Sequence, residues 1–535
     1  MTQRYDAIVV GGGHNGLVAA SYLARAGESV LVLEARDIVG GPAGAFEFLP
    51  GYRTSFANSP GSFERRVLTD LELHKYGLEF IRPDPTLVHA FPSNPFIGYR
   101  DRRLVHDQLN RFVPGEADRY QELLASLEEL GRQLGVSLFS PSPTIEALDE
   151  RMANSGHASL YQRVFHGSLA DLLDESLKST EAKALLGMIA LNGNMLPPTQ
   201  SGSAVGLMLR PISMASGSDF EVTASPLRGS SGLPVGGIGA IVDAIAAGLR
   251  AHGGEIICSA PVTRILHDGD RVSGVVTESG DEYIAPVVIS AIDPQLTGSL
   301  LVDDPTPTSD LLSEEADSGS AFKIVLALDG QPEYADLPDG LSTAQACAAQ
   351  FRIAPSFEYI EQSISDGLAG RPTSSPIIWG LLLSETSPHL APKGRGLLSI
   401  NAWHAPYELA EGEWDESRTE TFGQVCIDQV STLMPRIRDY IIDHRFMSPV
   451  EVESITRLPK ANITHGDMTL ESLFGNRPNR GLHDYRTWLR GLYLGCAGSW
   501  PGGYFTGVPG FGASHAVLAD KVSARPLRVG ADDVD

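Results

Sequence analysis

The fold of this chain is decided by the stretch Tyr5-Asp6-Ala7-Ile8-Val9-Val10-Gly11-Gly12-Gly13-His14-Asn15-Gly16. Its first half ends in apolar, β-branched residues, which are typical of a buried parallel strand. An alanine-rich helix is predicted over residues 17–27, and a second apolar strand, 30–33, ends at Glu34. Strand, glycine turn, helix, strand and acid in this order predict a dinucleotide-binding βαβ unit.

The glycines of this turn each have a physical role. Gly11 permits the tight exit from the strand, and Gly13 lets backbone N–H groups approach a pyrophosphate without a Cβ in the way. Gly16 lets the helix pack closely on the sheet. An ordinary βαβ unit with a glycine turn is the alternative reading of the same pattern.

Polar groups around the turn complete the predicted cofactor site. His14 and Asn15 stand in the turn, just before the predicted helix, whose unpaired N–H groups and positive dipole end would meet phosphate charge. Glu34 lies 21 positions after Gly13, where a carboxylate meets the ribose hydroxyls. Ala35, next to it, and Gly41, in the loop that follows, are further candidates for cofactor contact.

Composition limits the class of protein. A chain of 535 residues, 42% hydrophobic and 20% charged, is too long for one compact core, so two or more domains are expected. The net charge of −25 argues against nucleic acid as a partner. No apolar run is long enough to span a bilayer, and no basic leader precedes the first strand, so a cytoplasmic location is expected.

The four cysteines are far apart in the sequence, so neither a redox disulfide nor a cysteine-ligated metal site is predicted. An amphipathic helix is expected over residues 116–134, and another begins near Asp415 or Ser417. Strands are expected at 322–328 and 396–403, together with a hairpin formed by 271–277 and 281–289.

A second glycine-dense loop lies near the end of the chain. The strand 492–494 is followed by Gly-Cys-Ala-Gly-Ser-Trp-Pro-Gly-Gly-Tyr-Phe-Thr-Gly-Val at 495–508, and then by a helix of small residues. A structural turn is one reading of this loop. Paired with the N-terminal turn, it predicts a second helix N-terminus directed at the same cofactor.

These segments together resemble the phytoene desaturase-like flavoproteins, most of all the branch of pyridine nucleotide-disulphide oxidoreductase domain-containing protein 2. The resemblance covers essentially the whole chain and includes His465-Gly466-Asp467-Met468, Arg477-Pro478 and Leu492-Tyr493-Leu494. It implies an α/β fold in which a Rossmann-like FAD-binding domain, of the glutathione reductase and amine oxidase type, is joined to a mixed-sheet and helical substrate domain. The FAD-binding domain would comprise 1–75, 228–298 and 485–525, and the substrate domain 76–227 and 299–484.

The resemblance also implies further cofactor contacts. Val262 would meet the adenine through its backbone, Gly498 would lie near the pyrophosphate, and Gly507 and Val508 would lie near the flavin ring. The sequence departs from the family where His-Pro-Gly-Gly-Gly-Val is usual, because Trp500, Tyr504 and Phe505 introduce three aromatic side chains. We therefore expect a pocket of different shape, with Trp500 and Tyr504 as candidate walls.

The predicted function is FAD-dependent dehydrogenation or desaturation, in which a small apolar or secondary-metabolite substrate loses a hydride to flavin N5. Two alternatives stay open: an amine oxidase-like enzyme in which Trp500 and Tyr504 form an aromatic cage, and a flavin-bound interaction protein without turnover. His404, His465 and Tyr504 are the candidates for proton transfer. The sequence leaves open the electron acceptor, which would be oxygen, a quinone or soluble NAD(P), and it is compatible with an oligomer.

Overall fold

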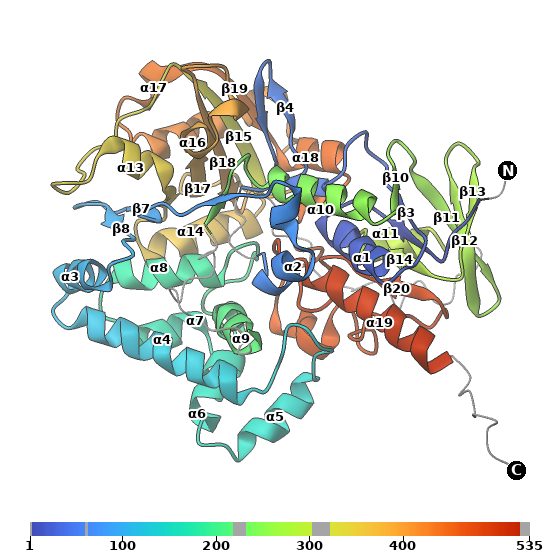
Figure 1. Ribbon diagram of the computed structural model, residues 1–535. Coiled ribbons are helices and arrows are strands. Elements are labelled where there is room, and N and C mark those ends of the chain that lie inside the picture. The colour runs from blue at the N-terminus through green and yellow to red at the C-terminus, as the bar shows by residue number, and fades with distance from the viewer. Residues whose placement is uncertain (1–2, 59–62, 218–231, 302–320, 525–535) are drawn as a thin grey trace, which may run out of the picture.

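The computed structural model describes residues 3–58, 63–217, 232–301 and 321–524. Two β-sheet regions lie side by side, and a group of helices lies beneath the larger sheet (Figure 1). The predicted domain boundaries near 227 and 525 fall outside the described residues, so they stay predictions.

The first region is a five-stranded, wholly parallel sheet with the order β10-β3-β2-β14-β20. Its strands are β2 (Ala7–Val10), β3 (Val30–Leu33), β10 (Glu255–Ile257), β14 (Val288–Ser290) and β20 (Leu492–Leu494). Three segments far apart in the sequence therefore share one sheet, as the resemblance implied. Helices α1 (His14–Arg25), α10 (Gly239–Ala251) and α19 (Val508–Ala524) lie together beside it (Figure 1).

A smaller four-stranded sheet lies at the edge of this region. Its order is β1-β13-β12-β11, with β1 (Gln3–Arg4), β11 (Val262–Asp268), β12 (Arg271–Thr277) and β13 (Glu282–Ile284). The predicted hairpin arm 281–289 was wrong in length, because the strand ends at Ile284 and β14 begins only at Val288. Pro286, which has no backbone N–H, separates the two strands, and β14 pairs with β2 in the parallel sheet.

The second region is a seven-stranded mixed sheet with the order β19-β15-β18-β17-β16-β7-β8. Its strands are β7 (Leu87–Ala90), β8 (Phe96–Ile97), β15 (Ala321–Leu328), β16 (Gln350–Ile353), β17 (Ile377–Leu382), β18 (Gly396–Trp403) and β19 (Ile441–Met447). The strands predicted at 322–328 and 396–403 are confirmed as β15 and β18.

One face of this sheet is covered by helices. Ile324, Phe351 and Ile400 are fully buried and pack with residues of α13 (Thr343–Ala348) and α16 (Glu416–Val430). Helix α16 begins where the sequence predicted, because the Asp415 side chain accepts a hydrogen bond from the Arg418 N–H. The opposite face carries polar side chains and is the one that concerns function.

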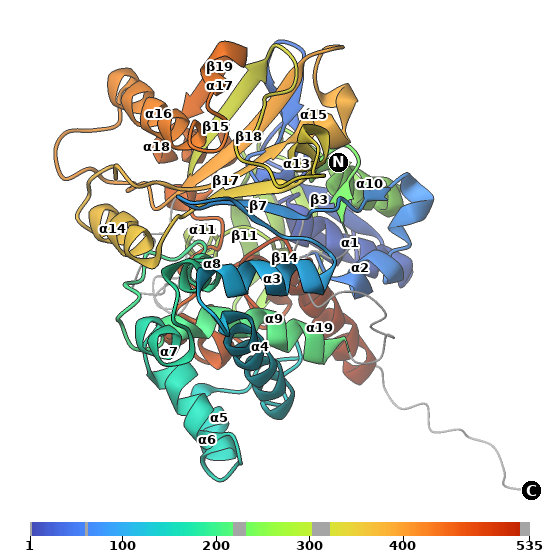
Figure 2. The ribbon, with the colours of Figure 1, turned by 90° about the vertical axis from the view of Figure 1, so that its left-hand side faces the viewer.

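Helices cover the lower side of the molecule (Figure 2). They are α3 (Arg102–Phe112), α4 (Glu116–Gln133), α5 (Ile145–Ala153), α6 (Ala158–Tyr161), α7 (Leu169–Ser176), α8 (Thr180–Ala190) and α9 (Leu209–Ser216). The predicted amphipathic helix is confirmed as α4, whose Leu123, Leu127 and Leu130 are buried.

The remaining elements connect these layers. They are β4 (Phe46–Leu49), β5 (Tyr52–Thr54), α2 (Arg65–Asp70), β6 (Phe80–Ile81), β9 (Leu233–Pro234), α11 (Pro294–Ser299), α14 (Phe357–Leu368), α15 (Leu383–Thr386), α17 (Ile437–Tyr440) and α18 (Pro449–Thr456). Among the described residues, no helix combines the length and apolar character needed to cross a membrane.

Candidate functional site

A cavity of about 1000 Å³ lies between the two sheet regions. At one end it meets the carboxyl ends of β2 and β3, where Val10 and Leu33 line it together with Gly11 and Gly13. Ligands of open α/β sheets bind outside the carboxyl ends of parallel strands. The predicted cofactor site is therefore one end of this cavity.

Gly13 forms the open part of the turn. It is the N-cap of α1, with extended backbone (φ −64°, ψ 168°), and a Cβ added there would meet no atom within 4 Å. The first intrahelical hydrogen bond runs from the Leu17 N–H to the Gly13 carbonyl, so the N–H groups of the first turn have no helical partner. This is the arrangement that a pyrophosphate requires.

Gly11 and Gly16 hold the shape of the turn. Gly11 has φ +98°, and a Cβ at Gly16 would lie 2.1 Å from the Gly11 carbonyl oxygen. Gly11 lines the cavity, whereas Gly16 is not one of the lining residues. The structure thus gives Gly16 a packing role, and its contact with a cofactor stays a prediction.

Glu34 lies at the cavity wall with both carboxylate oxygens held by backbone donors. The Gly12 N–H donates to Oε2 at 2.7 Å, and the Arg36 N–H donates to Oε1 at 2.9 Å. Burial raises the pKa of this carboxyl, while the backbone donors lower it. Each oxygen keeps a further lone pair for a ribose hydroxyl. Ala35, Gly41 and Val262 line the same part of the cavity.

Buried polar atoms without a hydrogen-bond partner show whether this end of the cavity fits FAD. His14, Asn15 and His465 line the cavity, and the buried atoms His14 Nε2, Asn15 Oδ1 and His465 Nδ1 have no hydrogen-bond partner among the described residues. Buried polar groups are normally paired, so these atoms indicate a polar ligand. A dinucleotide, with its many polar atoms, fits this donor and acceptor set and the open space at Gly13.

The C-terminal glycine loop reaches the cavity through three residues. Ala497, Tyr504 and Phe505 line it, and the Phe505 ring lies 4.3 Å from the His14 ring, centroid to centroid. The two ends of the chain therefore meet at one site. Gly498, Gly507 and Val508 are not among the lining residues, so their contacts with the cofactor stay predictions.

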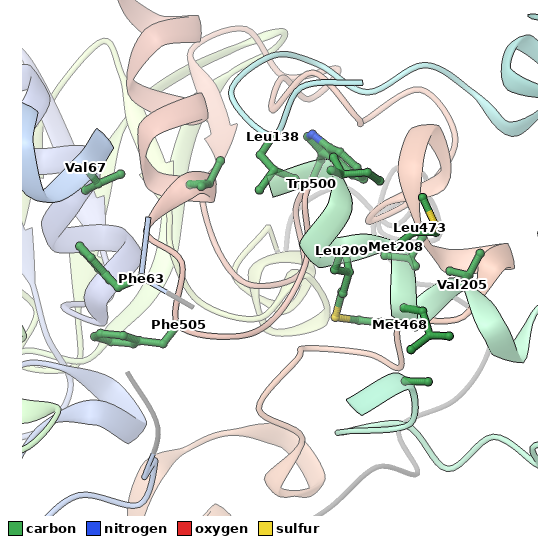
Figure 3. Close-up of a cluster of buried hydrophobic side chains, with 14 of the residues drawn as sticks. Phe63, Val67, Leu138, Val205, Met208, Leu209, Met468, Leu473, Trp500 and Phe505 are labelled. Atoms are coloured by element: carbon green, nitrogen blue, oxygen red, sulfur yellow. The ribbon is translucent and has the colours of Figure 1, made fainter. Parts of the chain in front are cut away.

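Trp500 does not wall the cavity, and the prediction that it does was wrong. Its side chain is fully buried in the hydrophobic core, its ring lies 5.2 Å from the Phe474 ring, and Leu138 and Met468 belong to the same core cluster (Figure 3). The indole is held away from the cavity because it fills the space between the loop and the helices beneath it. An aromatic cage built from Trp500 and Tyr504 is therefore not formed.

The structure places only two of the three candidates for proton transfer at the cavity. His404 lies outside the cavity, and its Nε2 is 3.0 Å from the Asn194 carbonyl oxygen. Burial lowers the pKa of His404 to about 4, as expected of a neutral structural histidine. His465 and Tyr504 do line the cavity, so only these two remain candidates.

His465 stands close to a carboxylate. Its Nδ1 lies 3.9 Å from Asp293 Oδ2, and its backbone has φ +52°. Burial lowers its pKa, while Asp293 raises it. Arg477, which is buried, donates hydrogen bonds from Nη2 and Nε to the Ala497 carbonyl, and also donates to the Thr464 carbonyl. Arg477 thus joins the His465 turn to the C-terminal loop.

Sequence reasoning missed a row of side chains on the seven-stranded sheet. Cross-strand register places Lys323 opposite Asn401, Asn401 opposite Trp379, and Trp379 opposite Arg352. Residues that lie directly opposite share one face of a sheet, and Asn401, Trp379 and Arg352 line the cavity. A lysine inside the otherwise apolar strand β15 was the available signal.

Lys323 is buried behind the cavity wall. Its Nζ donates to Asn58 Oδ1 at 2.6 Å, to Ser399 Oγ at 2.7 Å and to Asn401 Oδ1 at 3.1 Å. Burial lowers the pKa of this amine well below its ordinary value. Because Asn58 and Asn401 line the cavity, Lys323 fixes two amides in the cavity wall.

Comparison with known proteins agrees with this geometry. Residues 16–507 match the family described as flavin containing amine oxidoreductase. The chain is 29% identical to the pyridine nucleotide-disulfide oxidoreductase domain-containing protein 2 of Rattus norvegicus, over 96% of this chain and 94% of that protein. It is 26% identical to the all-trans-retinol 13,14-reductase of Danio rerio, over 86% and 77%.

A solved structure shares the fold. The cyclohexylamine oxidase of Brevibacterium oxydans superposes with a TM-score of 0.57 at 17% identity, over 97% of this chain and all of that one. At this identity the likeness concerns the fold alone. It agrees with the α/β arrangement of a cofactor sheet joined to a mixed sheet and helices.

Proposed function

Because the chain belongs to the flavin-containing amine oxidoreductase family and is an FAD-dependent oxidoreductase, we propose that it dehydrogenates a small, largely apolar organic substrate. The observation that carries this proposal is the lining of the cavity beyond the cofactor end. Val105, Leu109, Leu124, Leu186 and Leu207 line it there. Apolar walls with few polar groups are typical of small-molecule sites.

The lining residues bind the substrate and exclude water from it. Helices α3, α4 and α8 supply aliphatic side chains on one side, and the seven-stranded sheet supplies Trp379 and Trp403 on the other. When these side chains bury an apolar molecule, they remove water from around its reacting carbon. Electrostatic interactions inside the site are stronger without that water. The chemistry that bound FAD would supply is the acceptance of a hydride from the substrate.

His465 is the residue we propose for the accompanying proton. It lines the cavity, its Nδ1 lies 3.9 Å from a carboxylate, and burial lowers its pKa, which favours the neutral ring. A neutral imidazole can accept a proton when the substrate loses a hydride and a proton together. Tyr504, whose hydroxyl donates to the Asn192 carbonyl at 3.1 Å, is better suited to shaping the wall.

The relatives support an apolar substrate. The retinol reductase is named for a polyene alcohol. An amine is the second candidate substrate because of the family name. The cavity is unfavourable for the positive charge of an amine. The guanidinium of Arg352 stands over the Trp379 ring at 4.0 Å, so this aromatic face already carries a positive charge.

Anaerobic flavin bleaching tests the proposal. The purified FAD-loaded protein is mixed without oxygen with all-trans-retinol, with a carotene and with putrescine, and the flavin absorbance is followed. We expect bleaching by an apolar compound and none by the amine. Oxygen, a quinone or NAD(P) is then added to find which acceptor restores the colour. Bleaching by putrescine alone, with peroxide released in air, contradicts the proposal, and flavin that no compound bleaches favours an interaction protein.

Two variants of α4 connect the bleaching to the cavity. Leu124→Trp fills space in the apolar part and should slow bleaching at least about tenfold, with FAD content unchanged. Glu122→Trp on the exposed side of the same helix is the matched control and should behave as wild type. Equal bleaching rates in both variants would place the substrate elsewhere.

A further inference from the structure

The described residues that line the cavity include more positive than negative side chains, although the whole chain carries a net charge of −25. Among the described residues that line the cavity there are five arginines and three carboxylates. Two of the carboxylates, Glu34 and Asp293, belong to the cofactor end described above. The apolar end, in contrast, combines aliphatic walls with Arg210 and Arg352.

Arg352 is the arginine whose surroundings are best defined. It lies on β16, and its Nε and Nη2 donate to Gln350 Oε1 at 3.2 and 3.0 Å. Its guanidinium carbon lies 4.0 Å from the centroid of the Trp379 ring, which is its cross-strand partner. The ring contact and one amide hold the guanidinium, and they leave further N–H donors for a ligand in the cavity that Arg352 lines.

Within the described part of the chain, the charge of Arg352 is not neutralised by an ion pair. Among the described residues, no carboxylate lies within salt-bridge distance of it, and Tyr120 is the only group that raises its pKa. Burial lowers that pKa to about 10, so the group remains charged at neutral pH. A partly buried charge with no ion-pair partner among the described residues is costly unless a ligand supplies the opposite charge.

Neighbouring groups complete a small polar site within the apolar wall. Tyr120 on α4 and Arg210 on α9 also line the cavity, and both arginines lower the pKa of Tyr120 against the larger effect of burial. The phenol keeps its proton at neutral pH, because its pKa is raised to about 12. Two cations and one hydroxyl therefore face the same space.

The cofactor phosphates do not account for this site. The N–H groups predicted to hold them belong to the first turn of α1, beside the parallel sheet. Arg352 belongs to the other sheet, on β16 between β7 and β17. These strands lie above α3 and α8, toward the helical side of the molecule (Figure 2).

We propose that Arg352, with Tyr120 beside it, binds the carboxylate of the substrate, so that the substrate is an apolar molecule with one anionic end. This inference rests on the proposed function, because it names the class of molecule held in the same cavity. A guanidinium fork matches a carboxylate in geometry, and the stacked Trp379 ring pre-orients it. The aliphatic walls then hold the hydrocarbon part toward the cofactor end.

Binding of matched acids and alcohols tests this inference. The probes are oleate against oleyl alcohol, and all-trans-retinoate against all-trans-retinol. Their dissociation constants are measured on the FAD-loaded protein by flavin absorbance and by equilibrium dialysis. We expect each acid to bind at least about tenfold more tightly than its alcohol, as for a charge-assisted hydrogen bond. Equal affinities in the wild-type protein overturn the inference, and so does an absence of binding by all four probes.

Variants of Arg352 test whether this residue causes the preference for the acid over its alcohol. Arg352→Gln should abolish the preference for the acid, and Arg352→Lys should keep part of it. Arg445→Gln on β19 is the matched control, because Arg445 pairs with Glu451 at 2.9 Å outside the cavity. A full preference retained by Arg352→Gln with normal FAD content contradicts the inference. Should either variant fail to fold, the wild-type comparison still decides.

The two proposals fail in different ways. If the chain is no dehydrogenase, no compound bleaches the flavin, whatever its affinity. If only the anionic end is wrong, neutral apolar compounds bleach the flavin and bind as tightly as the acids. Dissociation constants and bleaching are therefore measured on the same preparations.

Discussion

Two glycine-rich turns of similar composition each precede a helix in this protein, yet they differ in what their glycines face. At the N-terminal turn, a Cβ on Gly13 would meet nothing within 4 Å. At the C-terminal loop, a Cβ on Gly503 would lie 2.3 Å from Thr464, and in the first turn of the helix that follows, one on Gly510 would lie 2.0 Å from the Asn15 carbonyl oxygen. The first turn keeps space for a ligand, and the second uses missing side chains to bring protein segments together.

This difference explains how the site is built. Helix α19 approaches α1 so closely that Gly510 touches the backbone of the first turn of α1. The same loop brings Phe505 against His14. A glycine-rich sequence before a helix therefore predicts close approach, but only the structure shows whether a ligand or another segment makes that approach.

Gly510→Ala should have the largest effect. Alanine normally favours a helix interior by about 1 kcal/mol, but here the methyl would clash with the Asn15 carbonyl. We expect a loss of more than about 4 kcal/mol in the free energy of unfolding, with FAD lost as well. Chemical denaturation measures the loss. Wild-type stability would mean that α19 does not pack on α1 as described.

Trp500→Ala should follow, because it removes a fully buried side chain from the core. The expected loss of stability is about 3–5 kcal/mol. Trp488→Ala is the control, since Trp488 is 38% exposed and should change stability by less than about 0.5 kcal/mol. If Trp500→Ala instead alters substrate affinity at unchanged stability, the indole lines the cavity after all.

Gly13→Ala should weaken FAD binding while leaving the stability of the fold nearly unchanged. The added methyl fits the backbone conformation but occupies the open space of the turn. We expect the stability of the apoprotein to change by less than about 1 kcal/mol, while the dissociation constant of FAD rises at least about tenfold. Gly156→Ala, equally open but outside the cavity, is the control. Unchanged FAD affinity would contradict the ligand role of the N-terminal turn.

Tyr504→Gly should give the smallest change in stability. Tyr504 has φ +69°, a conformation that glycine adopts freely, so relief of strain offsets the lost hydrogen bond to Asn192. We expect stability within about 1 kcal/mol of wild type and a changed substrate KM, because the side chain lines the cavity. Steady-state kinetics with unaltered KM and kcat would place Tyr504 away from the substrate.

The cofactor end of the site could be predicted because its signals are local. The spacing from Gly11 to Glu34 encodes one turn, one helix and one strand, and the geometry of that unit leaves little freedom. The structure accordingly places Gly11, Gly13 and Glu34 along one wall. Val262 came from the resemblance, and it too lines the cavity.

The substrate end could not be predicted in the same way. His404 and Trp500 were attractive as residue types, but burial in the core decides their roles. Arg352, Trp379 and Asn401 come from three strands and share one face only through the register of the sheet. A single sequence carries no signal for that register, because the pairing depends on contacts between distant segments.

The sequence by itself therefore determined a dinucleotide-binding βαβ unit, its glycine turn and its acid, since short-range backbone geometry specifies all three. Only the tertiary structure decided that the C-terminal loop closes on this turn, that Trp500 belongs to the core, and that Arg352 remains charged within an apolar wall. Those outcomes depend on which side chains exclude water from one another, and packing between segments hundreds of residues apart settles that.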